Sequence, residues 1–146
     1  FRNKEKMSIY FHQLVKVNLQ NRKSLKAFIP ILFTKEKKLF KSLSYIFCSD
    51  EYLLEVNNKF LQHNFYTDII TFDLSASKSS PTIGEIYISV DRVKENAITH
   101  QSSFETELHR VIFHGALHLC GYKDKTKKDS LFMRDKEDDY LSMYFE

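Results

Sequence analysis

Residues 104–120 have the hydrophobic pattern of a long amphipathic helix, and this segment constrains the fold more than any other. Its apolar residues recur at spacings of three and four and so form one stripe, which comprises Phe104, Leu108, Val111, Ile112, Gly115 and Leu119. A stripe of this kind has to be buried against a second layer of secondary structure. We therefore expect the rest of the chain to supply a surface on which this helix packs.

Four shorter segments are rich in β-branched and aromatic residues and are predicted to be strands. They cover residues 8–15, 42–48, 68–74 and 83–90. Further helices are predicted at 21–33 with Asn21 as N-cap and Pro30 as a kink, after Asp50 as N-cap through Phe60, at 91–100 and at 128–145. This order of elements predicts an α+β fold, or α/β sandwich, in which helices pack on a small mixed sheet of about four strands.

The length of 146 residues suits a single domain, which we expect to span residues 1–146. Residues 1–6 precede Met7 and are expected to be flexible or derived from cloning. No apolar run is long enough to cross a bilayer, and Cys48 and Cys120 lie too far apart in the sequence to indicate a disulfide framework. These features favour a cytoplasmic protein without a membrane partner.

Positive charge is concentrated at the start of the chain. Residues 1–41 contain 11 Lys and Arg against 2 acids, whereas residues 42–146 contain 11 against 17. A basic face attracts phosphate-rich partners such as RNA, although lysines that merely solvate an exposed helix give the same pattern. The asymmetry is therefore compatible with residues 16–41 helping to hold RNA.

The helix at 104–120 also carries two histidines, His114 and His118, which are four residues apart and lie on one side of it. Gly121 is placed to end the helix, so that the chain can turn and bring Asp124 back beneath the histidines. The spacing H-x3-H-x2-G-x2-D copies the metzincin zinc pattern, with aspartate in place of the last histidine. Since aspartate is also a zinc ligand, the stretch predicts a metal site formed by His114, His118 and Asp124.

Gly115 occupies the position at which zinc peptidases carry the glutamate that accepts a proton from water. A peptidase of the usual design is therefore disfavoured, whereas a metal ion at this site remains useful for phosphodiester hydrolysis. Among the other histidines, His109 falls off the line of the ligands, His12 lies in a predicted strand and His100 lies at a helix end. Cys120 is adjacent to the site but lies on the apolar side of the helix. We expect these residues to serve packing or surface roles.

Several motifs together resemble the YbeY family, which are bacterial endoribonucleases of rRNA maturation. The stretch "HGALHLCGYKD" (114–124) resembles the family signature H-G-x-L-H-L-x-G-Y-D-H. Similarly, "YTDIITFD" (66–73) resembles the segment P-T-D-V-L-S-F, and "GEIYIS" (84–89) resembles the strand G-D-I-x-I-S. The helices at "EVNNKFL" (55–61) and "MRDKEDDYL" (133–141) fit as well.

The resemblance implies a single-strand-specific, metal-dependent endoribonuclease that matures small-subunit rRNA 3′ ends and takes part in ribosome quality control. It further implies one bound Zn²⁺ on His114, His118 and Asp124, with His114 and His118 catalytic through the metal. The implied partners are precursor rRNA and the ribosomal small subunit or its assembly factors.

The chain departs from the family pattern at three positions. Asp124 replaces the usual third histidine, Lys123 replaces an acid, and Leu61 stands where the family usually has an arginine. If that arginine contacts RNA, nearby Lys59 and His63 are the candidates to replace it. Thr67 and Asp68 open a strand and are candidates for substrate binding, with capping as the alternative role. Glu85 is expected to be an exposed strand residue.

Two other functions compete with the nuclease. The loss of the arginine at Leu61 suits an assembly factor that binds rRNA without cutting it. The metal pattern alone also fits a zinc hydrolase or peptidase with an unusual base.

Overall fold

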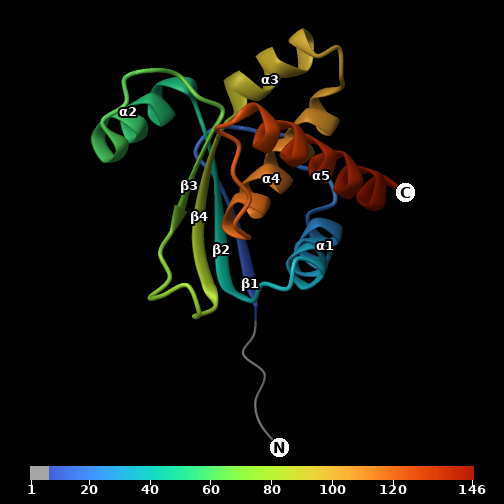
Figure 1. The fold of residues 1–146 in the computed structure, drawn as a ribbon. Helices are drawn as coiled ribbons and strands as arrows, with labels where there is room; N and C mark the ends of the chain where they lie inside the picture. The colour runs from blue at the N-terminus through green and yellow to red at the C-terminus, as the bar shows by residue number, and fades with distance from the viewer. Residues whose placement is uncertain (1–6) are drawn as a thin grey trace, which may run out of the picture.

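Four strands form one mixed sheet in the order β1-β2-β4-β3 in the computed structural model, which describes residues 7–146 (Figure 1). The strands are β1 (Ser8–Gln13), β2 (Phe40–Cys48), β3 (Ile69–Asp73) and β4 (Thr82–Ser89). β1, β2 and β4 run parallel, and β3 pairs antiparallel with β4. The predicted α+β fold with a mixed sheet is confirmed, while the expectation for residues 1–6 lies outside the described residues.

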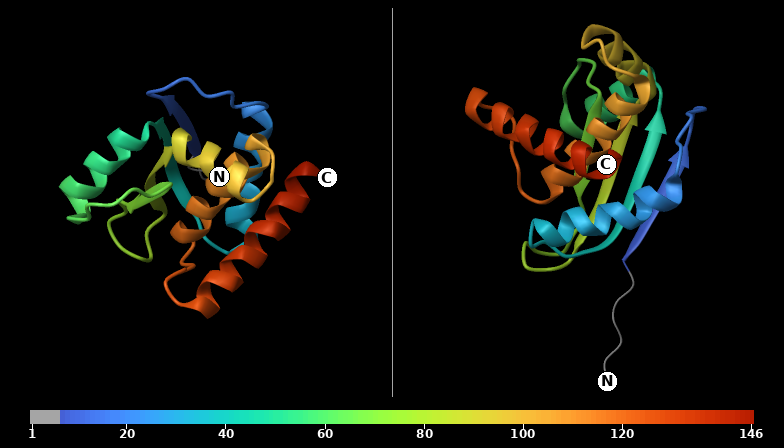
Figure 2. Two further views of the ribbon diagram at one scale, coloured as in Figure 1. Left: turned by 90° about the horizontal axis from the view of Figure 1, so that it is seen from above. Right: turned by 90° about the vertical axis from the view of Figure 1, so that its right-hand side faces the viewer.

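Helices cover both faces of this sheet (Figure 2). One face is covered by α1 (Arg22–Lys35), α4 (Phe104–Leu119) and α5 (Lys127–Phe145), and the other by α2 (Asp50–Leu61). α3 (Val90–Thr99) follows β4 directly at the end of the sheet. Within residues 7–146, no helix is both long and apolar enough to cross a membrane.

The larger hydrophobic core lies between the sheet and α1, α4 and α5, and α4 supplies much of it. Ten of the 16 residues of α4 are buried, because the predicted apolar stripe faces the sheet. Gly115 sits at the closest approach: a Cβ atom added there would lie 2.8 Å from Cγ2 of Ile86 and 3.0 Å from Cδ1 of Ile69. Zinc peptidases carry a glutamate at the position of Gly115. In this chain, that position is where α4 packs against the sheet.

A smaller core forms on the opposite face, under α2. It contains Cys48, Leu53, Val56 and Ile70, with Phe72 packed against it. Ile70 and Phe72 therefore share a face of β3 that points away from the main core.

The predicted caps and ends need several corrections. Ser49, not Asp50, caps α2, and its hydroxyl accepts a hydrogen bond from the Tyr52 amide. Asp50 instead accepts hydrogen bonds from Ser89 and Arg92. Asn21 is the N-cap of α1 but makes no capping bond with its side chain.

Several predicted boundaries also shift. The first strand ends at Gln13, before the predicted residue 15, and Val90 begins α3 where we predicted the end of a strand. Pro30 lies inside α1, which continues past it to Lys35.

Candidate metal centre

The end of α4 creates the turn on which the site depends. Gly121 has a φ of 107°, a left-handed conformation that glycine adopts readily. The Tyr122 amide donates to the Leu117 carbonyl at 3.1 Å and the Gly121 amide to the His118 carbonyl at 3.0 Å, which is the Schellman pattern of a helix end. The chain reverses here as predicted, and the following loop brings Asp124 to the two histidines.

Three side chains converge at this turn. Oδ2 of Asp124 lies 3.2 Å from Nε2 of His114 and 3.4 Å from Nε2 of His118. One ligand atom from each of the three residues lies within 4.8 Å of the other two, so the group could hold a metal ion. Bonds of about 2.0 Å in tetrahedral geometry would separate zinc ligands by about 3.3 Å. The predicted ligands therefore fit an ion of this size.

Hydrogen bonds on the far side of each imidazole orient it for this role. Nδ1 of His118 lies 2.9 Å from the Tyr122 carbonyl, which can only accept a hydrogen bond, so Nδ1 carries the proton. Nδ1 of His114 lies 2.5 Å from Oε2 of Glu137. In the neutral rings this leaves the lone pair on each Nε2, the atom that faces Asp124.

Glu137 is a further member of this group of side chains, and our sequence analysis missed it. Only 6% of its side chain is exposed, and its second oxygen accepts a hydrogen bond from Arg110 at 3.0 Å. Arg110 also binds Asp138, at 2.7 Å. A carboxylate behind a ligating histidine fixes the tautomer and strengthens the ligand. In the sequence, Glu137 is an acidic residue among the buried apolar positions of α5. Its spacing in the sequence does not connect it to His114.

The surrounding charges shift the pKa values of two side chains. Burial by itself lowers the pKa of His114, but the hydrogen bond to Glu137 and the negative charges of Glu137, Asp68 and Asp124 outweigh it and raise the pKa. Burial raises the pKa of Asp68, although the nearby His114 opposes this shift. Asp68 also accepts a hydrogen bond from Asn96 at 3.2 Å.

Two cavities meet at His114, and Asp68 and Asp124 line both of them. The smaller, of about 170 Å³, lies among α3, α4 and α5 and includes Glu107, Arg110 and Glu137. The larger, which we call the α2 cleft, has a volume of about 570 Å³. It is lined by Asn57, Leu61, His63, Phe65, Thr67, Asp68, Ile69, Ile70, Thr71, His114, His118, Asp124 and Lys125.

Comparison with known proteins identifies the family. The sequence model for Endoribonuclease YbeY matches residues 6–144. The chain belongs to the YbeY family of endoribonucleases. A relative named Endoribonuclease YbeY from Cytophaga hutchinsonii is 49% identical over 140 residues, which cover 96% of this chain and 97% of the relative. Another, from Karelsulcia muelleri, is 44% identical over 133 residues, or 91% of this chain and 93% of the relative.

The fold of a solved structure agrees with this assignment. The solution structure of TM1509 from Thermotoga maritima has a TM-score of 0.59 and 29% sequence identity, and the match covers 96% of this chain and 89% of that chain. The resemblance to the YbeY family that we inferred from the motifs is confirmed, and so is the assignment of the chain as an endoribonuclease.

The structure brings together three of the four substrate-binding residues suggested by the YbeY motifs. His63, Thr67 and Asp68 line the α2 cleft, whereas Lys59 lines a different depression together with Phe60. Leu61, at the position of the family arginine, is part of the cleft wall. Lys125, which we did not predict, is the only lysine or arginine among the described residues that line this cleft.

Three further residues, His109, Cys120 and Glu85, were expected to have packing or surface roles. His109 is buried and its Nδ1 pairs with the Glu105 carbonyl, which confirms a packing role. Burial raises the pKa of the Cys120 thiol to about 12, so this side chain is a poor metal ligand. Glu85 is half-buried rather than exposed and accepts a hydrogen bond from Tyr87.

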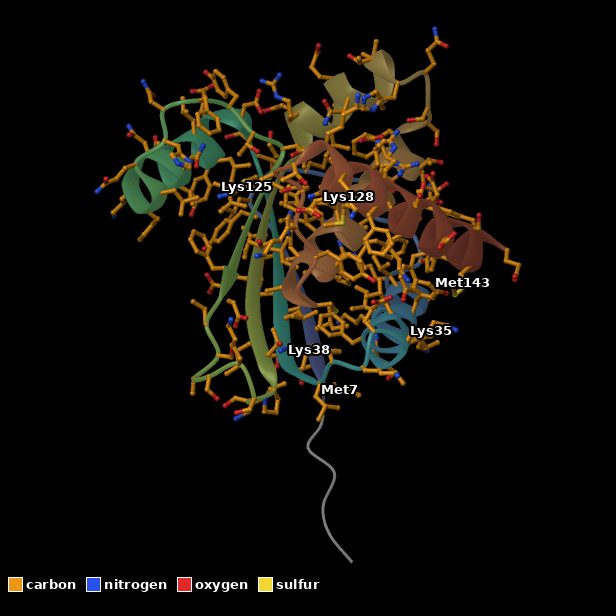
Figure 3. The ribbon with its side chains drawn as sticks, in the orientation of Figure 1. Met7, Lys35, Lys38, Lys125, Lys128 and Met143 are labelled. Atoms are coloured by element: carbon orange, nitrogen blue, oxygen red, sulfur yellow. The ribbon has the colours of Figure 1, made fainter. Side chains whose placement is uncertain are left out.

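The basic segment 16–41 does not contribute to either cavity. Figure 3 shows Lys125 beside the end of the sheet where β3 begins, while Lys38 lies toward the opposite end. A role for residues 16–41 in holding RNA stays a prediction about a different surface.

Proposed function

We propose that the chain is a zinc-dependent endoribonuclease that cleaves single-stranded precursor rRNA in the cytoplasm, in maturation of the 3′ end of the small-subunit rRNA and in ribosome quality control. The observation that carries this proposal is the convergence of His114, His118 and Asp124 beside a cleft. A donor set of two imidazoles and one carboxylate leaves room for a fourth ligand, as catalytic zinc sites require.

One Zn²⁺ ion held by these three residues would polarise a phosphoryl oxygen and acidify a water molecule. Glu137 would keep the proton of His114 on Nδ1 and hold the ring in place, and the Tyr122 carbonyl would do the same for His118. The Asp68 carboxylate lines the cleft beside His114 and is the group that we assign to take up or position a proton.

Gly115 and Leu61 bear on the two competing functions, a zinc peptidase and an assembly factor that does not cut RNA. Gly115 packs against the sheet, so a side chain at the position of the peptidase glutamate would collide with Ile86. This contact, together with the family assignment, favours the ribonuclease over the peptidase. The second competing function is that of an assembly factor, which would bind rRNA and the small subunit or its assembly factors without cutting RNA. The apolar Leu61 in the cleft wall is compatible with this function.

The test combines elemental analysis with RNA cleavage. Purified wild-type protein should contain about one zinc per chain and should cut single-stranded RNA but not a duplex of the same sequence. A chelator and His114→Ala should each abolish cleavage, whereas His12→Ala, which alters a histidine on β1, should leave it intact. Full cleavage by metal-free protein would refute the proposal. Equal association of wild type and His118→Ala with ribosomal particles, without cleavage by either, would favour the assembly factor.

A further inference from the structure

Two aromatic rings belong to the wall of the α2 cleft. His63 and Phe65 are stacked, with ring centroids 5.0 Å apart and an interplanar angle of 21°. Phe65 is 56% exposed, although an aromatic ring of this size is normally buried. Both residues line the same cleft as His114, His118 and Asp124.

The loop that carries these rings is held in place by one buried residue. The backbone carbonyl of Asn57 accepts a hydrogen bond from the His63 amide at 3.1 Å, and the Asn57 side chain donates to the Phe65 carbonyl at 2.9 Å. Asn57 is only 2% exposed, since it lies on the inner side of α2. The backbone that carries the ring pair is therefore tied to α2 at both His63 and Phe65, which lowers the entropic cost of binding to the loop.

The charge of the cleft indicates what the rings can bind. Among the lining residues that the structure describes, Lys125 is the only lysine or arginine, and it is set against Asp68 and Asp124. Leu61 adds an apolar side chain to this wall. Apart from the metal-binding group, this wall offers a single lysine to the phosphates of RNA, and its apolar part suits the flat, uncharged face of a nucleobase.

We propose that His63 and Phe65 form a stacking platform for a base of the RNA next to the cleaved phosphodiester. This inference rests on the proposed ribonuclease function and names the contact by which the site selects its substrate. A base can reach the platform only when it is unstacked from its neighbours, so the platform favours unpaired nucleotides over a duplex.

The test uses a matched pair of variants, Phe65→Ala and Phe60→Ala. Phe60 is an equally exposed aromatic residue of the same region, at 62%, but it packs edge-on against Phe72 and does not line the α2 cleft. Loss of a stacked base should raise KM for single-stranded RNA about tenfold in Phe65→Ala. The values of kcat and zinc content should stay at wild-type levels, since the variant leaves the metal ligands intact. Phe60→Ala should match wild type, and Phe65→Trp should restore KM.

A second measurement does not require cleavage. The fluorescence of a single-stranded RNA that contains 2-aminopurine should change on rapid mixing with the wild-type holoprotein, because the base leaves its neighbours and stacks on the platform. Phe65→Ala should alter this fluorescence change and Phe60→Ala should preserve it. A KM and a fluorescence change in Phe65→Ala equal to those of the wild type would overturn the platform while leaving the nuclease intact. A fluorescence change that depends on Phe65 in a protein that never cuts RNA would support the platform and reject the nuclease.

Discussion

Glu137 decides how firmly His114 is held, because its carboxylate is both buried and hydrogen-bonded to the ring. We expect Glu137→Gln to weaken zinc binding about 10- to 100-fold, since the neutral amide holds the ring proton less strongly. Zinc affinity measured by competition with a fluorescent chelator checks this result. Asp138→Asn is the matched control: Asp138 also contacts Arg110, but it is mostly exposed and makes no contact with His114. Equal affinities in the two variants would show that the carboxylate behind His114 has no effect.

Asp68 lies at the junction of the two cavities and is not a member of the metal-binding group. We expect Asp68→Asn to lower kcat about 100-fold, because the amide cannot accept a proton. Zinc content should be unchanged. Single-turnover cleavage and elemental analysis of the same preparation measure both quantities. Asp73→Asn, at the exposed opposite end of β3, should cleave RNA at the wild-type rate. Loss of zinc in Asp68→Asn would instead make Asp68 part of the metal site.

At the scale of the elements, Gly115 sets how closely α4 approaches the sheet. Gly115→Ala should lower the free energy of unfolding by about 1–3 kcal/mol, because the new methyl group overlaps Ile86. Thermal or urea denaturation measures this change. Ser142→Ala, on the exposed side of α5, should change it by less than about 0.5 kcal/mol. If Gly115→Ala is as stable as wild type, then Ile86 and Ile69 can shift to make room for the methyl group.

The elements also show which parts of the site the sequence could predict. The ligand spacing and the turn at Gly121 depend on residues within one helix and its end, so periodicity and glycine chemistry were sufficient to predict them. The pairing of His114 with Glu137 joins residues 23 apart and depends on how α5 docks on α4, which no local pattern encodes. Lys59 was a candidate for the cleft by sequence proximity alone, but its position on α2 places it beside Phe60.

At the scale of the whole molecule, zinc should bind the folded chain and thereby stabilise it. A zinc concentration 100 times its Kd raises the free energy of unfolding by about 2.7 kcal/mol. For a domain of this size the corresponding rise in Tm is about 8 °C. Differential scanning calorimetry with zinc and with chelator measures the shift. His118→Ala should show none, and a full shift in that variant would place the stabilising ion elsewhere.

The three proposed metal ligands differ in how they are attached to the protein. His114 and His118 belong to α4, which is embedded in the main core, whereas Asp124 lies on the loop between α4 and α5 and is 38% exposed. In the proposed site, movement of the single Asp124 carboxylate would admit or release the ion without disturbing α4, which is packed in the main core. Loading and exchange of the metal would then take place in the folded protein, through the loop that carries Asp124.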